Sequence, residues 1–427
     1  MNYWKKRAEK FLELKEKYDS SSQEPSPNGR YIILSQNDHN ANRIEKNIKR
    51  SELNYETISY DKILSQKKSI DNVLSEKKVI IIKKTGVGIV KLSDEEFKSS
   101  NKHSNLLIIP DLKIQNSNQQ TSEEILAQDD QNTKMTYGIR MGEIKLDSHF
   151  NGKQVSIAIL DTGIDKKHPD LKEKIADGKS WIDNESDFSD TNGHGTHCAG
   201  IIVGGVDSNG RRYGVAPEAK LYVGKVLDHN GEGFLSNLLC AIDWAIKNEC
   251  NIISMSLTSK LYDISNAVQS DLFEKAEKKR IVMIAAAGNN SDHSSGTTHI
   301  ISNPAASHSV IAVGAIDKCY KLYNKSNVGV YPRLPLGFVA PGVDVYSTWL
   351  SENGEKNYKT CTGTSASAPF VAGIFALTIS KFHNNRRINS YRRRASPEQL
   401  LNAINKNVLD RWGNSNLYGI GLPLAPK

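Results

Sequence analysis

Short apolar runs separated by stretches with helical spacing dominate the chain from Tyr137 onward. Continuous apolar runs are typical of strands buried on both faces of a parallel sheet. The runs are VSIAIL, KLYVGKV, NIISMSL, IVMIAAA and SVIAVGA, and the helical positions between them are Leu238, Ile242, Ala245 and Ile246, then Ile264, Val268 and Leu272. This alternation predicts an α/β fold with a doubly wound, mostly parallel sheet and helices on both faces.

Upstream of this region the pattern is mixed. Strands predicted at RYIILS, KKVIIIKK and NLLIIPDLKI alternate with two short helices, which indicates a small α+β unit. The second of these helices begins at Ser93, with Glu96 completing a capping box. Near the C-terminus Ser396, followed by Pro397 and by Gln399, predicts another helix start of the same kind.

Composition divides the chain into four parts. Residues 1–27 form a charged extension that ends in the Ser/Pro/Gly-rich stretch SSSQEPSPNG, and residues 28–115 form the small α+β domain. Residues 116–136 are rich in Gln, Asn and Ser and predict an exposed, protease-sensitive linker. Residues 137–427 form the large α/β domain.

The overall composition is that of a globular protein. Of the 427 residues 38% are hydrophobic and 24% charged, with a net charge of +8. The densest basic cluster, Arg386, Arg387 and Arg392 to Arg394, is interpreted as a solvated loop, because no zinc-ligand spacing or interleaved aromatic residues accompany it. We therefore expect no nucleic-acid partner.

Neither the cysteines nor the apolar runs point to export or to a membrane. The five cysteines include no C-x-x-C pair and do not predict a disulfide framework. No run reaches the roughly 18 apolar residues of a membrane span, and the first stretch, MNYWKKRAEKFLELKEKYDSSS, lacks the apolar middle of a secretory signal. We expect no transmembrane segment and a monomer.

Asp161 follows the first apolar run, in the stretch ILDTGID. An Asp-Thr-Gly can be half of an aspartic protease, in which two aspartates share a proton, but the sequence contains no second Asp-Thr-Gly or Asp-Ser-Gly. Ligand-facing groups in open α/β sheets lie at the carboxyl ends of strands, which is where this residue is expected. A capping carboxylate is the simpler alternative.

Three further residues complete a chemical set with Asp161. His194 in NGHGTHCAG and Ser365 in GTSASAP each open a predicted helix, and Asn289 follows Gly288 at the end of a buried strand. Alternatives are an N-cap for the serine and a metal pair of His194 with His197, although zinc helices normally space two histidines four apart around a Glu. Together the four residues supply the nucleophile, base, orienting carboxylate and oxyanion donor of amide hydrolysis.

Three sequence blocks carry a family resemblance. ILDTGIDKKHPDL, NGHGTHCAG and GTSASAPFVAG occur in this order, and the three candidates are spaced by 33 positions (194 minus 161) and then by 171 positions (365 minus 194). In these blocks the chain resembles the subtilisin-like serine proteases, which have the order Asp, His, Ser. The segments YGVAPEAKLYVGKVL, VAPGVDVYST and YGIGLP agree, so the resemblance extends from about Tyr137 to the C-terminus.

The resemblance implies a role for each candidate. Ser365 would be the nucleophile, His194 the general base and then acid, Asp161 the group that orients the imidazole, and Asn289 the side-chain donor to the oxyanion. The expected function is that of a serine endopeptidase, which hydrolyses peptide bonds of proteins through an acyl-enzyme and needs no cofactor for catalysis.

The resemblance also implies how a peptide binds. HNGEGF and SMSLTS resemble the two segments that pair with an extended substrate by strand addition. The contacts would come from Gly231 and Gly233 on one side and from Ser256 and Leu257 on the other, with Gly288 beside the oxyanion donor.

The small N-terminal domain resembles the inhibitory prodomain of the same family, through GVGIVKLSDEEFKSS and LLIIPD. The resemblance implies a self-processing zymogen whose prodomain assists folding and inhibits the enzyme, and family habit implies secretion. Two alternatives share the site. One is a catalytically silent peptide-binding protein, and the presence of all four catalytic residues argues against it. The other is a peptide ligase or cyclase, and the sequence shows no lid-like insertion near Ser365 that would exclude water from the site.

Several positions depart from the family pattern. Thr258 stands where the family usually has glycine and predicts a narrower main specificity pocket, and Ala366 replaces the common methionine, which removes an oxidation-sensitive neighbour. Cys198 and Cys361 near the triad are interpreted as inert small side chains, with sensitivity to thiol reagents as the alternative.

Structural calcium is allowed by the resemblance without being required. Asp170, with Asp207 and Asn209 in a following loop, roughly matches positions that help to bind calcium in some relatives, although the loop spacing differs.

Overall fold

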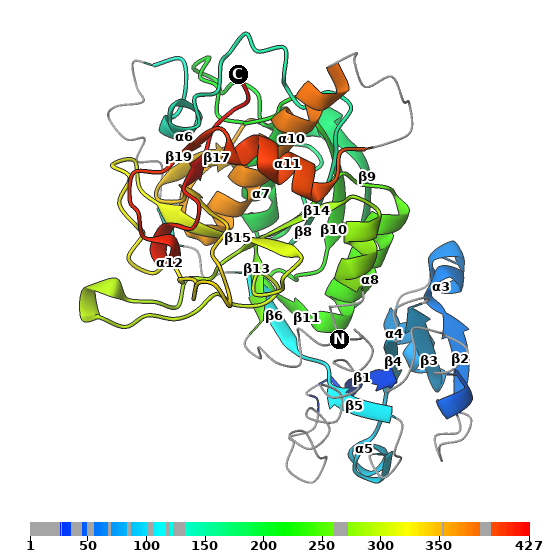
Figure 1. Cartoon of the computed structure of the whole chain (residues 1–427). Coiled ribbons are helices and arrows are strands. Elements are labelled where there is room, and N and C mark those ends of the chain that lie inside the picture. Colours follow the sequence, from blue (N-terminus) through cyan, green and yellow to red (C-terminus); the bar gives the residue numbers. More distant parts are fainter. Residues whose placement is uncertain are drawn as a thin grey trace.

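The structure is a computed structural model in which a small sheet lies beside a large α/β body (Figure 1). It describes residues 26, 28–35, 45–48, 55–66, 70–82, 87–100, 106–116, 120–122, 133–183, 185, 187–259, 272–351, 354–384 and 394–427.

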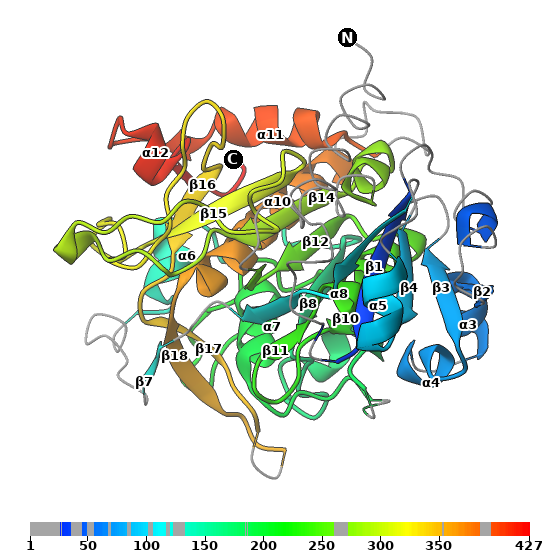
Figure 2. The same cartoon turned by 90° about the horizontal axis from the view of Figure 1, so that it is seen from below.

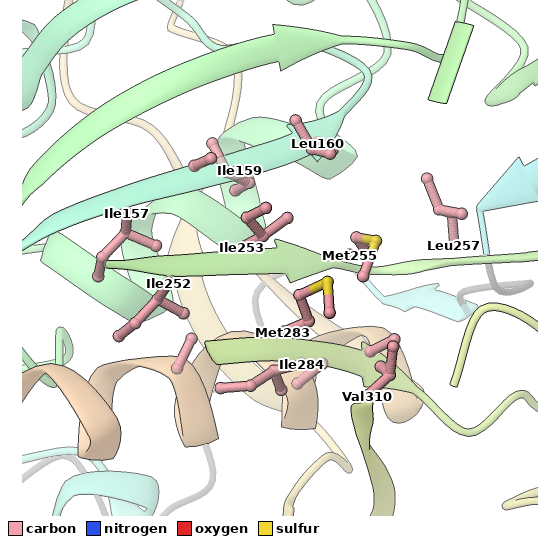
Figure 3. Close-up of a cluster of buried hydrophobic side chains, with 14 of the residues drawn as sticks. Ile157, Ile159, Leu160, Ile252, Ile253, Met255, Leu257, Met283, Ile284 and Val310 are labelled. Carbon is pink, nitrogen blue, oxygen red and sulfur yellow. The ribbon is translucent and has the colours of Figure 1, made fainter. Parts of the chain in front are cut away.

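A seven-stranded sheet forms the centre of the large body. Every pair of neighbouring strands is parallel, as the continuous apolar runs predict. Figure 3 shows aliphatic and Met side chains of β8, β12 and β14 packed together in its interior. The strand order is β16 (Phe338–Pro341), β15 (Val310–Ile316), β14 (Val282–Ala286), β12 (Ile252–Met255), β8 (Ser156–Asp161), β10 (Lys220–Lys225) and β9 (Ile175–Ser180).

Helices cover both faces of this sheet (Figure 1). α7 (His194–Val203) and α10 (Thr364–Asn384) pack against each other on one face, and α8 (Leu235–Lys247) lies on the other. Among the described residues only α10 is long and apolar enough to cross a membrane, and it is buried in the core, as the central helix of a globular domain is. The doubly wound α/β prediction is confirmed.

The N-terminal sheet has five strands and helices of its own. All its strand pairs are antiparallel except β2 with β3, and its side chains alternate between two apolar clusters, one of which is continuous with the core of the large body. The strand order is β2 (Glu56–Ser59), β3 (Lys78–Ile82), β4 (Val87–Lys91), β1 (Arg30–Ser35) and β5 (Leu106–Pro110), and the helices are α3 (Tyr60–Gln66), α4 (Ile70–Leu74) and α5 (Asp94–Ser100).

Buried polar contacts join the N-terminal sheet to the large body. Asp111, just after β5, accepts hydrogen bonds from the backbone N–H of Ser236 at 3.0 Å and from its hydroxyl, at the start of α8. Arg30 of β1 donates to Asn237 of the same helix at 3.2 Å and pairs with Asp183. Burial raises the pKa of Asp111 to about 6, against the opposing effect of the hydrogen bonds from Ser236.

The chain then crosses the large body as two short strands. β6 (Lys113–Asn116) lies between β11 (Glu232–Phe234) and β13 (Leu257–Ser259) and is antiparallel to both (Figure 1). β7 (Gln120–Ser122) pairs with β18 (Tyr358–Thr362), which pairs in turn with β17 (Val345–Thr348) (Figure 2). Described parts of the segment predicted as a linker therefore form strands with the large body.

Most predicted elements are present. β8, β10, β12, β14 and β15 correspond to the five apolar runs, and both capping boxes form, at Ser93 with Glu96 and at Ser396 with Gln399, where α11 (Pro397–Asn405) begins. The strands β9 and β16 were not predicted. The positions Ile264 and Val268 and most of the basic cluster lie outside the described residues; Arg394 of that cluster donates to the carbonyl of Cys250 at 3.1 Å.

Candidate active site

The end of one strand and the start of one helix bring Asp161 and His194 together. Asp161 is the last residue of β8 and His194 the first of α7, so both lie at the carboxyl edge of the parallel sheet. His194 Nδ1 and Asp161 Oδ1 are 2.6 Å apart, and both side chains are 1% exposed. The carboxylate accepts a hydrogen bond from Nδ1–H, which leaves Nε2 as the basic nitrogen of the imidazole.

Asp190 holds the start of the helix that carries the imidazole. Its Oδ1 accepts hydrogen bonds from the N–H of Gly193 at 3.0 Å and from the hydroxyl of Thr162 at 2.9 Å, and its Oδ2 accepts one from the N–H of Thr196 at 3.0 Å. The Thr162 hydroxyl oxygen accepts in turn from the N–H of Gly195 at 2.9 Å. A carboxylate at a helix N-terminus satisfies exposed N–H groups and complements the helix dipole, so it fixes the imidazole in place.

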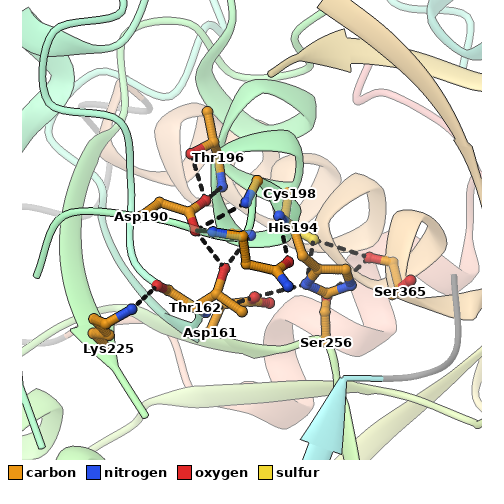
Figure 4. A network of polar contacts seen from close by, with 12 residues as sticks. Asp161, Thr162, Asp190, His194, Thr196, Cys198, Lys225, Ser256 and Ser365 are labelled. Atoms are coloured by element: carbon orange, nitrogen blue, oxygen red, sulfur yellow. Dashed lines mark hydrogen bonds and ion pairs between the residues drawn. The ribbon is translucent and has the colours of Figure 1, made fainter. Parts of the chain in front are cut away.

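Ser365 lies in the first turn of α10, and its backbone is held from two sides. Its carbonyl oxygen accepts hydrogen bonds from Ser256 Oγ at 2.8 Å and from Cys198 Sγ at 3.4 Å. Its own Oγ and His194 Nε2 are buried and have no hydrogen-bond partner among the described residues. Figure 4 shows the imidazole between the Asp161 carboxylate and Ser365, so the nitrogen without a partner and the hydroxyl without a partner lie on the same side of the site.

Asn289 lies beside the serine through a contact with the same helix. Its Oδ1 accepts a hydrogen bond from the N–H of Thr364 at 2.9 Å, which fixes the orientation of the amide. A Cβ added to Gly363 would lie 2.9 Å from Asn289 Nδ2 and 3.2 Å from Ser365 Oγ. The amide nitrogen and the hydroxyl therefore border the same small space, which a glycine at position 363 leaves open.

The two histidines of α7 differ in charge and contacts. Burial alone would lower the pKa of His194, but the Asp161 carboxylate outweighs it and holds that pKa well above the usual 6.5. Burial lowers the pKa of His197 to about 3, and its Nε2 lies 2.9 Å from the carbonyl oxygen of Val345. The structure gives the two imidazoles separate partners, which does not favour a metal site shared by them.

A second group of side chains has metal-ligand chemistry. The ligand atoms of Asp161, His194 and Cys198 lie within 4.8 Å of one another, and all three residues are buried. Burial raises the pKa of Cys198, so the thiol is held in its neutral form, which binds metals poorly. A metal here would also have to replace the hydrogen bond between the carboxylate and the imidazole.

The predicted peptide-binding segments lie on both sides of β6, and the space that β6 fills between them is called the groove here. Gly233 pairs with Ile114 of β6, and Leu257 pairs with Asn116. The N–H of Asn116 donates to the carbonyl of Gly231 at 2.9 Å, and a Cβ at position 231 would lie 2.5 Å from the Asn116 side chain. These glycines thus allow a strand to approach closely, and a segment of the chain itself occupies the groove.

Comparison with known proteins identifies the family. The sequence model of the subtilase family matches residues 152–421. The chain belongs to the subtilase family.

Subtilisin DY of Bacillus licheniformis is 38% identical over 273 residues, which cover 64% of this chain and 90% of that relative. The major intracellular serine protease of Bacillus subtilis (strain 168) is 41% identical over 236 residues, covering 54% and 69%. A thermophilic serine proteinase of Bacillus sp. (strain AK1) is 36% identical over 263 residues, covering 61% and 60%.

The positions at which this subtilase departs from the family pattern are all buried. Thr258 of β13 pairs with Gln115 of β6, and Ala366 lies inside α10. Cys361 of β18 pairs with Thr121 of β7. Burial raises the pKa of Cys361 well above its usual value, which agrees with an inert thiol.

Sequence reasoning missed three residues that shape the site of this subtilase. Asp190 precedes the catalytic helix by a few residues, and an acidic residue just before a helix start is a signal that could have found it. Lys225 is fully buried and donates to the carbonyl of Thr162 at 2.7 Å, and Gly363 borders the space between Asn289 and Ser365. Those two roles depend on contacts between segments far apart in the chain, which no local pattern shows.

Proposed function

We propose that this subtilase hydrolyses peptide bonds with Ser365 as nucleophile, His194 as general base and then acid, and Asp161 as the orienting carboxylate. The observation that carries the proposal is the 2.6 Å contact between His194 Nδ1 and Asp161 Oδ1, which leaves Nε2 basic on the side of Ser365 Oγ. Family membership supports the same chemistry, and protein substrates follow from it.

The chemistry proceeds in two acyl-transfer steps. Ser365 Oγ attacks the scissile carbonyl while His194 Nε2 takes its proton, and the resulting imidazolium is stabilised by the Asp161 carboxylate. The imidazolium then protonates the leaving amine, which leaves an acyl group on Ser365. Water, deprotonated by His194, attacks the ester and releases the acid, and the proton returns to the serine.

The negative oxygen of each tetrahedral intermediate has two donors in this proposal. One is Asn289 Nδ2, which borders the space beside Gly363. The other is the backbone N–H of Ser365, because N–H groups in the first turn of a helix lack intrahelical partners. Donors fixed in advance stabilise the transition state more than the substrate, so they raise kcat.

Asn289→Ala tests this acyl-transfer chemistry. We expect kcat to fall about 10²- to 10³-fold with little change in KM, because the lost hydrogen bond forms only in the transition state. Steady-state kinetics on a peptide anilide measure both constants. Asn290→Ala is the matched control, since its exposed side chain lies one residue further on. An Asn289→Ala enzyme with unchanged kcat would contradict the assignment.

We also propose that substrates bind as the chain's own β6 does. An extended peptide would add a strand between β11 and β13, with main-chain contacts to Gly231, Gly233 and Leu257. Ser256 fits a supporting role better than direct contact, because its hydroxyl holds the carbonyl of Ser365.

Self-processing of a zymogen is the third part of the proposal. Asn116 at the end of β6 pairs with Leu257. Leu257 follows Ser256, whose hydroxyl donates a hydrogen bond to the carbonyl of Ser365. Gln120 at the start of β7 pairs with Thr362, close to the serine in sequence on the other side of the site. We infer that the chain cuts itself between Asn116 and Gln120. The N-terminal sheet would then be a prodomain that keeps β6 in the groove as an inhibitor.

A further inference from the structure

Asp170 lies in a buried polar cluster on the side of the large body that carries β18. Its Oδ2 accepts hydrogen bonds from the hydroxyls of Tyr213 at 2.7 Å and of Tyr358 at 2.8 Å. Its Oδ1 lies 2.8 Å from Lys356 Nζ, and the carboxylate is only 9% exposed. Both carboxylate oxygens are therefore engaged, and the charge is balanced by the ammonium of Lys356.

The same ammonium holds a neighbouring loop. Lys356 Nζ donates to the backbone carbonyl of Val206 at 3.2 Å. Val206 begins a small hairpin in which it forms a bridge with Arg212. The ammonium thus joins one carboxylate oxygen and one backbone carbonyl oxygen from two separate segments. Carboxylate and backbone carbonyl oxygens are the ligands that Ca²⁺ takes in proteins.

Asp207, the second candidate calcium ligand, is also occupied. Its Oδ2 accepts from the Arg211 guanidinium at 2.8 Å, and its Oδ1 accepts from the N–H groups of Asn209 at 2.9 Å and of Arg211 at 2.8 Å. The carboxylate is buried, while the residue Asn209 is exposed. These bonds close the tip of the hairpin within itself, so its carboxylate is not directed at Asp170.

The residues that would supply a calcium site do not fit the ion. Ca²⁺ takes six to eight oxygens at about 2.3 to 2.6 Å, and here the oxygens of both carboxylates face N–H and O–H groups of the chain. A divalent ion beside Asp170 Oδ1 would have to displace the Lys356 ammonium, since two cations cannot share that position. The loop between Val206 and Arg212 is already held by the cations of the chain itself.

We infer that Lys356, with Arg211, takes the place of a structural calcium ion in this subtilase, and that the hairpin from Val206 to Arg212 is held without metal. A covalently attached cation is not removed by chelators or dilution. The stability contributed by this site is therefore independent of free calcium.

Thermal unfolding of the full chain tests the inference. Ser365→Ala is used as the background, so that self-cleavage does not change the sample. The readout is the shift in Tm between excess chelator and millimolar calcium, compared with the same shift in Asp170→Asn. We expect the two shifts to agree within about 1 °C. A calcium-induced rise in Tm that is larger by about 5 °C in the background chain than in Asp170→Asn would overturn the inference.

A second variant tests the ammonium directly and does not depend on the folding of Asp170→Asn. Lys356→Met is expected to lower Tm by about 3 °C or more, equally with chelator and with calcium, because it leaves a buried carboxylate without its cation. Lys172→Met is the matched control, since this lysine is exposed and lies near Asp170 in sequence, and its Tm is expected to stay within about 1 °C. Equal Tm values for Lys356→Met and Lys172→Met would contradict the inference.

Discussion

The Ser365→Ala enzyme is expected to hydrolyse peptides with a kcat about 10⁶-fold below that of the wild type, the size of loss found when the nucleophile of subtilisin is removed. Without the hydroxyl no acyl-enzyme forms, and only binding and oxyanion stabilisation remain. The helix start that carries residue 365 is held by contacts to its carbonyl, from Ser256 and Cys198, and these contacts do not involve the deleted hydroxyl. The loss should therefore appear without a change in fold.

Ser367→Ala is the matched control for this loss. Ser367 lies on the same helix and is equally buried, but its hydroxyl donates to the carbonyl of Ala340 at 3.0 Å, away from the imidazole. We expect its kcat to stay within about tenfold of the wild type. Both variants and the wild type are assayed with a peptide anilide after an added protease of another mechanistic class has removed the N-terminal segment and has been inhibited, because Ser365→Ala is not expected to process itself. Comparable kcat values for Ser365→Ala and wild type would exclude the proposed nucleophile.

Asp161→Asn is expected to lower kcat about 10⁴-fold and to change its pH dependence. The carboxylate raises the pKa of His194 above 6.5, so the imidazole keeps its proton to higher pH than usual. Because only the neutral imidazole is a base, kcat/KM of the wild type reaches its maximum above the pKa of His194 and falls as the pH drops through that pKa. The amide removes the carboxylate's effect, so the acid limb should move to lower pH.

The pH profiles of kcat/KM for wild type, Asp161→Asn and Asp177→Asn provide the test. Asp177 lies in β9 with an exposed side chain, so its amide variant makes the same chemical change away from the site and should leave both kcat and the acid limb unchanged. An acid limb that stays in place in Asp161→Asn would show that another group, not His194, controls it.

The sequence indicated the large sheet because its central strands are buried on both faces and leave continuous apolar runs. β9 was missed for the opposite reason: it lies at the edge of the sheet, and its residues IADGKS are largely polar. β16 is short, and its residues FVAP end in a proline, so its pattern is not that of a strand in isolation. Whether a strand lies at the edge of the sheet, and how long it is, depend on tertiary packing. Edge strands and short strands therefore leave little signal in the local sequence pattern.

The sequence predicts which residues form the candidate site, but it does not predict the strand that lies beside them. Asp161 ends a strand, and His194 and Ser365 lie in the first turn of a helix; such positions meet at one edge of a parallel sheet. The insertion of β6 into the groove was not predictable, because KIQN has no strand pattern and acquires its pairing only from β11 and β13. The ion pair of Lys356 with Asp170 joins residues that are far apart in sequence, so no spacing signals it.

The central proposal is that Ser365 cuts its own chain at the groove. The most direct test is the intact mass of the purified full-length wild type beside Ser365→Ala after incubation at neutral pH. We expect only the wild type to lose a segment, with the new end between Asn116 and Gln120, while Ser365→Ala keeps its full mass. Loss of the same segment from both chains, or from neither, would contradict self-processing by Ser365.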